Sequence, residues 1–336
     1  MKKLLALTLA LLMVAAAFVG CGDKAPNSSE TPSDTGSEYK LGLATNVVYA
    51  DAQTGKVAAD TNVAAVILDK DGKIVDCVFD AVSASVEIAD GLLADGADKL
   101  TFKSKHDLGD AYNMKTYGGA VAEWYEQANA FAEFCVGKTA AEVKATALND
   151  KGVPTAADLT ASCTIGVTDY VAAIVKACED AAAKSFKASG DIKLGLTVDG
   201  KVEAAKDSEA NDGSVKYLTT VAASAVVDGK LAAAIVDAAQ PEFTFDDTGA
   251  VTAAKYNGTK RELKDNYGMV AYANAKAEWY KQAEALENAC VGKTADEVKS
   301  VANAEGKAAN ADLAANCTIA VGGDVANIVT AMGKAK

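Results

Sequence analysis

The feature that most constrains the fold is an internal repeat. The segment AEWYEQANAFAEFCVGKTAAEVK at 122–144 returns as AEWYKQAEALENACVGKTADEVK at 277–299. Other matching segments keep nearly the same spacing, between 153 and 157 residues along the chain. A match of this length at a nearly constant spacing indicates a duplicated structural unit. The sequence therefore predicts two tandem copies of one small domain, at 40–187 and 188–336.

Each copy begins with strands and ends with helices. At 61–81 the alternating sequence TNVAAVILDKDGKIVDCVFDA surrounds an Asp-Gly turn, which predicts a β-hairpin. Its counterpart in the second copy lies at 221–237, and further strands are expected at 40–48 and 98–104. From residue 121 to 135 the apolar residues recur with the period of a helix. Strands followed by helices predict the α+β fold class, in which helices cover a hairpin-led antiparallel sheet.

The motif Gly-Lys-Thr occurs in both copies, at 137–139 and 292–294, and invites a nucleotide-binding interpretation. A P-loop requires a further Gly at position 132 and a strand leading into the motif. Position 132 is Ala, and a predicted helix precedes it. The spacing of Thr139 and Glu142 instead predicts a helix capping box, and the same pair recurs in the second copy.

The N-terminus has the pattern of an export signal. MKK precedes the apolar run LLALTLALLMVAAAFV, so residues 1–20 predict a signal peptide. The next residues, VGCG, resemble the lipobox of bacterial lipoproteins, in which the Cys, here Cys21, becomes the lipidated N-terminus. We therefore expect an exported protein, held by lipid on the outer face of the cytoplasmic membrane at the cell surface. The alternative is an ordinary secretory signal with an incidental Cys. Residues 21–39, rich in Ser, Thr, Pro, Asp and Gly, predict a flexible tether.

The charge of the chain argues against nucleic acid as a partner. The formal net charge is −13, and removal of residues 1–20 leaves 31 basic against 46 acidic residues, or −15. A surface this acidic repels phosphate backbones.

Motifs of hydrolytic or metal-dependent chemistry are absent from the sequence. His106 is the one histidine, and Arg261 takes its place in the second copy, so both are expected to be exposed basic side chains. Glu123 and its counterpart Glu278 could act in acid–base catalysis, but the favoured interpretation is a solvated helix face. We therefore expect no metal site, and a catalyst is the less favoured interpretation.

Six cysteines remain once Cys21 is assigned to lipid. An even number in an exported chain favours disulfides. The duplicated spacing predicts two equivalent bridges, and the two cysteines found in the first copy alone predict a third. The expected pairs are Cys135–Cys163, Cys290–Cys317 and Cys77–Cys178. Reactive thiols or metal ligands are the alternatives.

The order of DGKI hairpin, middle helices, Asp…Cys-Thr-Ile and closing amphipathic helix resembles the FMN-binding domain family. That domain occurs in subunits of bacterial ion-pumping oxidoreductases and in lipoproteins of extracellular electron transfer. In its flavinylated members a Thr carries FMN through a phosphoester bond made by a dedicated transferase. The resemblance implies that Thr164 and Thr318 are the acceptor positions, with Asp158 and Asp312 as the motif aspartates six residues earlier.

Two hypotheses follow from this resemblance. In the first, the repeats carry flavin for electron transfer to a redox partner, with aromatic side chains as ring contacts or as core. These side chains are Tyr112, Tyr267, Trp124 and Trp279. In the second, the repeats are a flavin-free scaffold or bind another small ligand, because the family's Ser-Gly-Ala before the Thr is replaced by Ala161-Ser162-Cys163. The missing Gly matters because Gly lets the backbone approach a phosphate closely.

Overall fold

The computed structural model describes residues 36–49, 54–180, 183–208 and 212–336. The predicted signal peptide, Cys21 and most of the predicted tether lie outside these residues. The first strand begins at Ser37, three residues inside the segment predicted as tether. None of the described helices is long and apolar enough to cross a membrane.

The first sheet is antiparallel and contains the predicted hairpin. Its strand order is β4-β3-β2-β1-β6. The bounds are Ser37–Tyr49 for β1, Lys56–Leu68 for β2, Ile74–Ala89 for β3, Leu92–Leu93 for β4 and Lys184–Ala188 for β6. The turn between β2 and β3 is closed by Asp69, whose carboxylate accepts hydrogen bonds from the backbone N–H groups of Asp71 and Lys73. Gly72 takes the positive φ, 75°, that this turn requires.

The second sheet is also antiparallel, with the order β11-β10-β8-β7-β5 and with β9 paired to β8. The bounds are Thr101–Lys103 for β5, Ile192–Lys206 for β7, Gly213–Val227 for β8, Lys230–Ala239 for β9, Glu242–Phe245 for β10 and Val251–Lys255 for β11. β5 precedes residue 187 in the chain yet pairs with β7, and β6 pairs with β1. The first sheet therefore combines β1 to β4 with β6, and the second combines β7 to β11 with β5.

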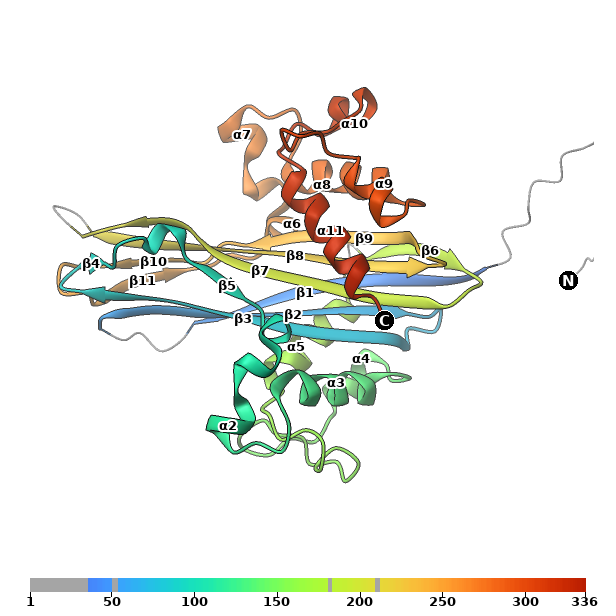
Figure 1. Ribbon diagram of the computed structural model, residues 1–336, viewed down its shortest axis with the longest axis horizontal. Helices are drawn as coiled ribbons and strands as arrows, with labels where there is room; N and C mark the ends of the chain where they lie inside the picture. Colours follow the sequence, from blue (N-terminus) through green and yellow to red (C-terminus); the bar gives the residue numbers. More distant parts are fainter. Residues whose placement is uncertain (1–35, 50–53, 181–182, 209–211) are drawn as a thin grey trace, which may run out of the picture. The chain divides into compact units, whose positions relative to one another are not determined.

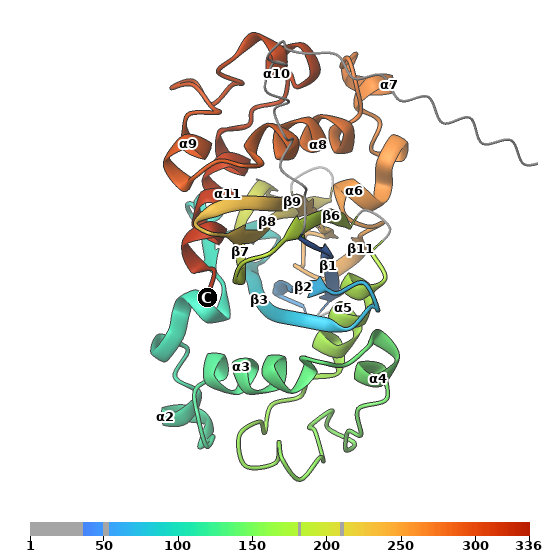
Figure 2. The same ribbon diagram turned by 90° about the vertical axis from the view of Figure 1, so that its right-hand side faces the viewer.

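The two sheets pack face to face within residues 36–336. One apolar cluster joins side chains of both sheets, including Val63, Ile67, Tyr217 and Ile235. The Tyr217 hydroxyl donates a hydrogen bond across this interface to the Val57 carbonyl oxygen, at 2.8 Å. Figures 1 and 2 show the sheets between two groups of helices, which gives four layers: helix, sheet, sheet and helix.

One group of helices covers the outer face of each sheet (Figure 2). On the first sheet they are α1 Lys105–Leu108, α2 Met114–Gly118, α3 Trp124–Cys135, α4 Ala140–Lys144 and α5 Thr168–Cys178. On the second they are α6 Lys260–Leu263, α7 Met269–Ala273, α8 Trp279–Cys290, α9 Ala295–Lys299, α10 Ala311–Asn316 and α11 Gly322–Lys334. Each group forms its own apolar cluster with the sheet beneath it. The observed fold is thus mixed α+β with antiparallel sheets, and the predicted capping boxes at Thr139 and Thr294 are confirmed.

The closing helices lie against a strand through a glycine. A Cβ added at Gly42 in β1 would be 2.1 Å from the Ala177 carbonyl oxygen of α5. A Cβ added at Gly195 in β7 would be 1.8 Å from the Ala331 carbonyl oxygen of α11. Real Cβ atoms cannot approach so closely, so the glycine of each KLGL segment is required by this contact.

Candidate functional site

A cavity of about 540 Å³ lies among the helices over the first sheet, close to the closing helix α5. Its walls include Lys105, Tyr112, Trp124, Thr164 and Tyr170. Three of these residues were singled out from the sequence: Tyr112 and Trp124 as aromatic side chains and Thr164 by the family resemblance. The volume lies within the range of small-molecule sites, about 300–1,000 Å³.

Lys105 supplies the positive charge of this cavity. Its Nζ donates a hydrogen bond to the Tyr170 hydroxyl at 3.3 Å. It also lies 5.5 Å from the ring centroid of Tyr112 and 5.5 Å from that of Trp124. Burial works against protonation of this amine, but Tyr170, Tyr112 and Asp60 outweigh it, so the pKa of Lys105 is raised. The ammonium therefore stays charged at neutral pH and can bind an anion.

The two aromatic residues differ in exposure. Trp124 is only 2% exposed and packs edge-on against Phe79, 6.0 Å between ring centroids, so it is mainly a core residue. Tyr112 is half-buried and belongs to the 3-10 turn Gly109–Tyr112 that leads into α2. Of the two rings, Tyr112 is the more accessible to a ligand.

Gln127 holds Thr164 in place. This side chain of α3 is fully buried. Its Oε1 accepts hydrogen bonds from the Thr164 backbone N–H at 2.7 Å and from the Thr164 hydroxyl at 2.9 Å. Its Nε2 donates to the Ala122 carbonyl oxygen at 2.8 Å. Thr164 itself is exposed, so its hydroxyl can be reached from solvent.

The same arrangement occurs over the second sheet. Gln282 of α8 is fully buried, and its Oε1 accepts from the Thr318 N–H at 2.7 Å and the Thr318 hydroxyl at 3.1 Å. Lys260 Nζ lies 5.2 Å from the ring centroid of Tyr267 and 5.4 Å from that of Trp279. The sequence interpretation missed both glutamines and both lysines. The signal was the final Gln of the repeated Glu-Trp-Tyr-x-Gln, a polar residue one turn from the Trp on a buried helix face.

The motif aspartates lie apart from the threonines' hydrogen bonds. Asp158 is exposed on the turn before Cys163, and Asp312 is exposed in the first turn of α10. Within the described residues, neither carboxylate makes a hydrogen bond to its threonine.

The prediction of a solvated helix face for Glu123 and Glu278 was wrong. Glu123 and Glu278 are only 6% and 5% exposed. The Glu123 carboxylate accepts hydrogen bonds from the backbone N–H groups of Met114, at 2.8 Å, and Lys115, at 3.2 Å. It therefore fixes the start of α2, next to Tyr112.

The prediction of exposed basic side chains at His106 and Arg261 was also wrong. The His106 ring lies edge-on against Trp124, 5.3 Å between centroids. The Arg261 side chain is 11% exposed, and its guanidinium donates to Glu287 at 2.7 Å. Glu287 is 1% exposed and is also paired with Lys184 of β6 at 3.1 Å. A buried ion cluster thus joins α8, the start of α6 and a strand of the first sheet.

All six cysteines among the described residues are free thiols in this structure. The Cys77 thiol is hydrogen-bonded to Cys135, and this contact together with burial raises the pKa of Cys77 well above its usual value. Cys163, beside Thr164, is fully buried. None of the three predicted bridges is formed here, and they stay a prediction. Within the described part of the chain no cluster of three or more His, Cys, Asp or Glu side chains could hold a metal ion.

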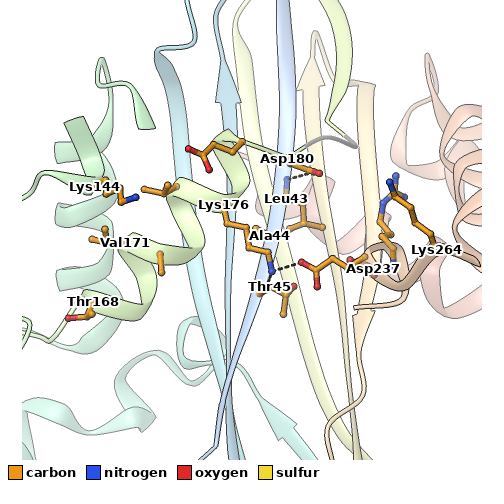
Figure 3. Close-up of a pocket in the computed structure, with 15 residues that line it drawn as sticks. Leu43, Ala44, Thr45, Lys144, Thr168, Val171, Lys176, Asp180, Asp237 and Lys264 are labelled. Carbon is orange, nitrogen blue, oxygen red and sulfur yellow. Dashed lines mark hydrogen bonds and ion pairs between the residues drawn. The ribbon is translucent and has the colours of Figure 1, made fainter. Parts of the chain in front are cut away.

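A larger cavity, of about 760 Å³, lies between α5 and the start of α6 (Figure 3). Lys176 on its wall donates to the Thr45 carbonyl oxygen at 2.8 Å and is paired with Glu262. Asp180, just after the end of α5, accepts from the Leu43 N–H at 3.4 Å. Arg261 lies on its wall, but none of the residues predicted to contact flavin does. Two of its cations already have carboxylate partners, since Lys176 is paired with Glu262 and Arg261 with Glu287. The cavity at Lys105 is therefore the better candidate for an anionic ligand.

Comparison with known proteins gives one partial likeness. The chlorophenol reductase of Desulfitobacterium hafniense is 38% identical to this chain over 95 residues. The match covers 25% of this chain and 29% of that protein, so the chain spans less than a third of the relative's length. No family model matches the chain, and no solved structure matches it.

Proposed function

We propose that this protein is an exported, lipid-anchored surface protein built from two copies of one α+β unit. The cavity at Lys105 binds a planar anionic cofactor of the FMN type, and the protein carries electrons outside the membrane. The observation that carries the proposal is the meeting of Tyr112, Trp124 and Thr164 around one cation in one cavity.

The side chains present suit such a ligand. The Lys105 ammonium, the Tyr170 hydroxyl and the Thr164 hydroxyl line the same cavity, and this donor set fits a phosphate group. The half-buried ring of Tyr112 offers a face for an aromatic ring system. Gly119 also lines the cavity, and a Cβ added there would meet nothing within 4 Å, so the backbone leaves open space at this wall. Bound flavin would supply the redox chemistry, and the protein would position it and tune its potential.

Gln127 has a defined role in covalent attachment. The Thr164 hydroxyl donates a hydrogen bond to Gln127 Oε1, and this bond orients the Thr164 oxygen before any reaction. A phosphoester at that oxygen would remove this one hydrogen bond. The bond from the Thr164 N–H to the same Oε1 would remain and keep the loop in place. Gln127 is therefore a positioning residue, and Thr164 is the acceptor.

The partial likeness to a protein named as a reductase is compatible with a redox role, although it covers only 29% of that protein.

A flavin-free scaffold or binding protein is the second candidate. The observation that favours it is the closed hydrogen bonding at Thr164, whose N–H and hydroxyl are both taken by Gln127. Cys163 stands where the family has a small residue after Gly, and the Asp158 carboxylate is turned to solvent. In this case the Thr164 hydroxyl serves only to hold the loop, and no FMN is attached to it.

The test is the intact mass and the visible absorbance of the exported protein, produced in a host that carries a flavin transferase. We expect the mass to increase by one attached FMN and the protein to show the visible absorbance of a flavin. The gain should be lost in Thr164→Ala and retained in Thr160→Ala, a matched control in the same exposed loop. An unmodified mass together with a colourless protein would favour the flavin-free candidate.

A further inference from the structure

We infer that the flavin site of the first half, at Lys105, is the one that binds, and that the corresponding place in the second half is a structural copy that excludes the ligand. This inference rests on the proposed function and deepens it, because the sequence resemblance nominates Thr164 and Thr318 equally. Two differences between the halves carry it, one of charge and one of space.

The first difference is the group that lies beside the equivalent lysines of the two halves, Lys105 and Lys260. The closing helices align as TDYVAAIV at 168–175 and GGDVANIV at 322–329, so Asp324 takes the place of Tyr170. In the first half, Lys105 meets a neutral hydroxyl. In the second half, the aligned residue is Asp324, and burial raises the pKa of its carboxyl to about 6 against the opposing effect of Lys260.

The consequence is a different local charge at neutral pH. With a pKa of about 6, the Asp324 carboxyl is mostly ionised there and opposes the charge of Lys260, so a phosphate entering the second half would meet a carboxylate. Lys105 has the carboxylate of Asp60 in its surroundings, but Asp60 is exposed, and solvent screens it. The first half therefore attracts an anion, and the second half does not.

The second difference is the size of the residues at the cavity wall. Three glycines line the cavity in the first half: Gly118, Gly119 and Gly166. The aligned residues of the second half are Ala273, Asn274 and Ala320. The backbone is alike at the middle position, since Gly119 has φ 62° and Asn274 has φ 51°. An Asn at that position adds side-chain atoms to a wall where the glycine of the first half leaves open space.

The features that the halves share are structural. Gln127 and Gln282 are both fully buried and hold a threonine in the same way, although the charge and the wall around them differ. A hydrogen bond present in both halves therefore explains the retained Thr318 without a ligand. The glutamine–threonine bond serves the fold, and Tyr170 with the three glycines gives the first half its specificity.

The experiment is equilibrium dialysis of FMN against the purified full chain, with the number of sites and Kd measured for matched variants. We expect one FMN per chain, with Kd raised about tenfold or more in Lys105→Gln and Tyr170→Asp and unchanged in Lys260→Gln. Tyr170→Phe removes the hydroxyl without adding charge, so it should weaken binding less than Tyr170→Asp. This variant serves if Tyr170→Asp fails to fold. The triple variant Asp324→Tyr, Asn274→Gly, Ala320→Gly should raise the number of sites from one to two.

The outcomes separate the inference from the proposed function. Two FMN per wild-type chain, or binding lost in Lys260→Gln but kept in Lys105→Gln, would overturn the inference and leave flavin binding intact. One site in the triple variant would overturn the assignment of specificity to these positions. Failure of the wild-type chain to bind FMN would overturn the proposed function and the inference with it.

Discussion

Replacement of Gln127 by Leu separates the role of Gln127 in the fold from its role at the cavity. The change removes the hydrogen bonds from the Thr164 N–H at 2.7 Å, from the Thr164 hydroxyl at 2.9 Å and to the Ala122 carbonyl oxygen at 2.8 Å. At about 1 kcal/mol net for each bond, the loss is about 3 kcal/mol. Thr164 is exposed and can bond to water instead, and the Leu side chain fills most of the same space. The expected loss of stability is therefore about 2 kcal/mol.

The assay is urea unfolding followed by circular dichroism, together with FMN uptake at a temperature well below Tm. A loss of this size lowers Tm by about 5 °C in a chain of this length. Gln282→Leu is the matched control, because Gln282 makes the same bonds to Thr318 and is equally buried. Both variants should lose similar stability, but only Gln127→Leu should lose FMN uptake.

Two results would refute this reasoning. Unchanged unfolding midpoints in both variants would mean that the buried amides contribute nothing net to the fold. Equal FMN uptake by Gln127→Leu and the wild-type chain would mean that Thr164 does not need Gln127 to present its hydroxyl.

Two further predictions concern buried charge. Glu287→Leu leaves Arg261 and Lys184 without their shared carboxylate, so it should lower the free energy of unfolding in urea by about 3–5 kcal/mol. Adding Arg261→Leu removes one of the unpaired charges and should recover part of this loss. No recovery would contradict the ion-cluster explanation. Burial raises the pKa of Asp237 to about 7, against hydrogen bonds from Thr259, Ala238 and Arg261. The folded chain then holds this proton more tightly than the unfolded chain, whose Asp pKa is about 3.9, so stability should fall as pH rises from about 4 to about 7 and level off above. Asp237→Asn should flatten that slope, and an unchanged slope would show that Asp237 does not titrate in this range.

The local elements of the fold could be predicted because their causes are local. The Asp-Gly turns fix the hairpins, since the turn needs a residue with positive φ at Gly72 and again at Gly229. The Thr139 and Thr294 capping boxes fix the start of α4 and α9 through bonds that span three residues. The period of the apolar residues gives α3 and α8, although Val121 lies outside the helix and is 59% exposed.

The packing of the two sheets could not be predicted, because it depends on contacts between residues far apart in the chain. The run VAAVIL at 63–68 is buried on both faces, with one face against the second sheet and the other against helices. A strand covered on one face would alternate apolar and polar residues, and this run is apolar throughout. The pairing of β5, from the first predicted copy, with β7 of the second sheet has no local sequence signal at all.

The candidate site was predicted in its aromatic and hydroxyl members and missed in its charged and amide members. Tyr112, Trp124 and Thr164 were found by residue type and by family resemblance. Lys105 was missed because a lysine is read as solvated unless its surroundings are known, and Glu123 was misread for the same reason. Burial of a polar side chain depends on the fold, so it can be recognised only from the three-dimensional structure.

The internal repeat makes the second half a reference for the first. Both halves keep the glycine that lets the closing helix lie on a strand, Gly42 and Gly195. Both also keep the glutamine that ties the threonine loop to the long helix. These shared interactions serve the fold, because each fills a buried contact whose loss lowers stability. Where the halves differ, at Tyr170 and Asp324, the change alters the charge of a cavity and leaves the helix intact. A position that can change without harm to the fold is free to be set by a ligand, so the difference between the halves, rather than their likeness, supports the proposed ligand site in the first half.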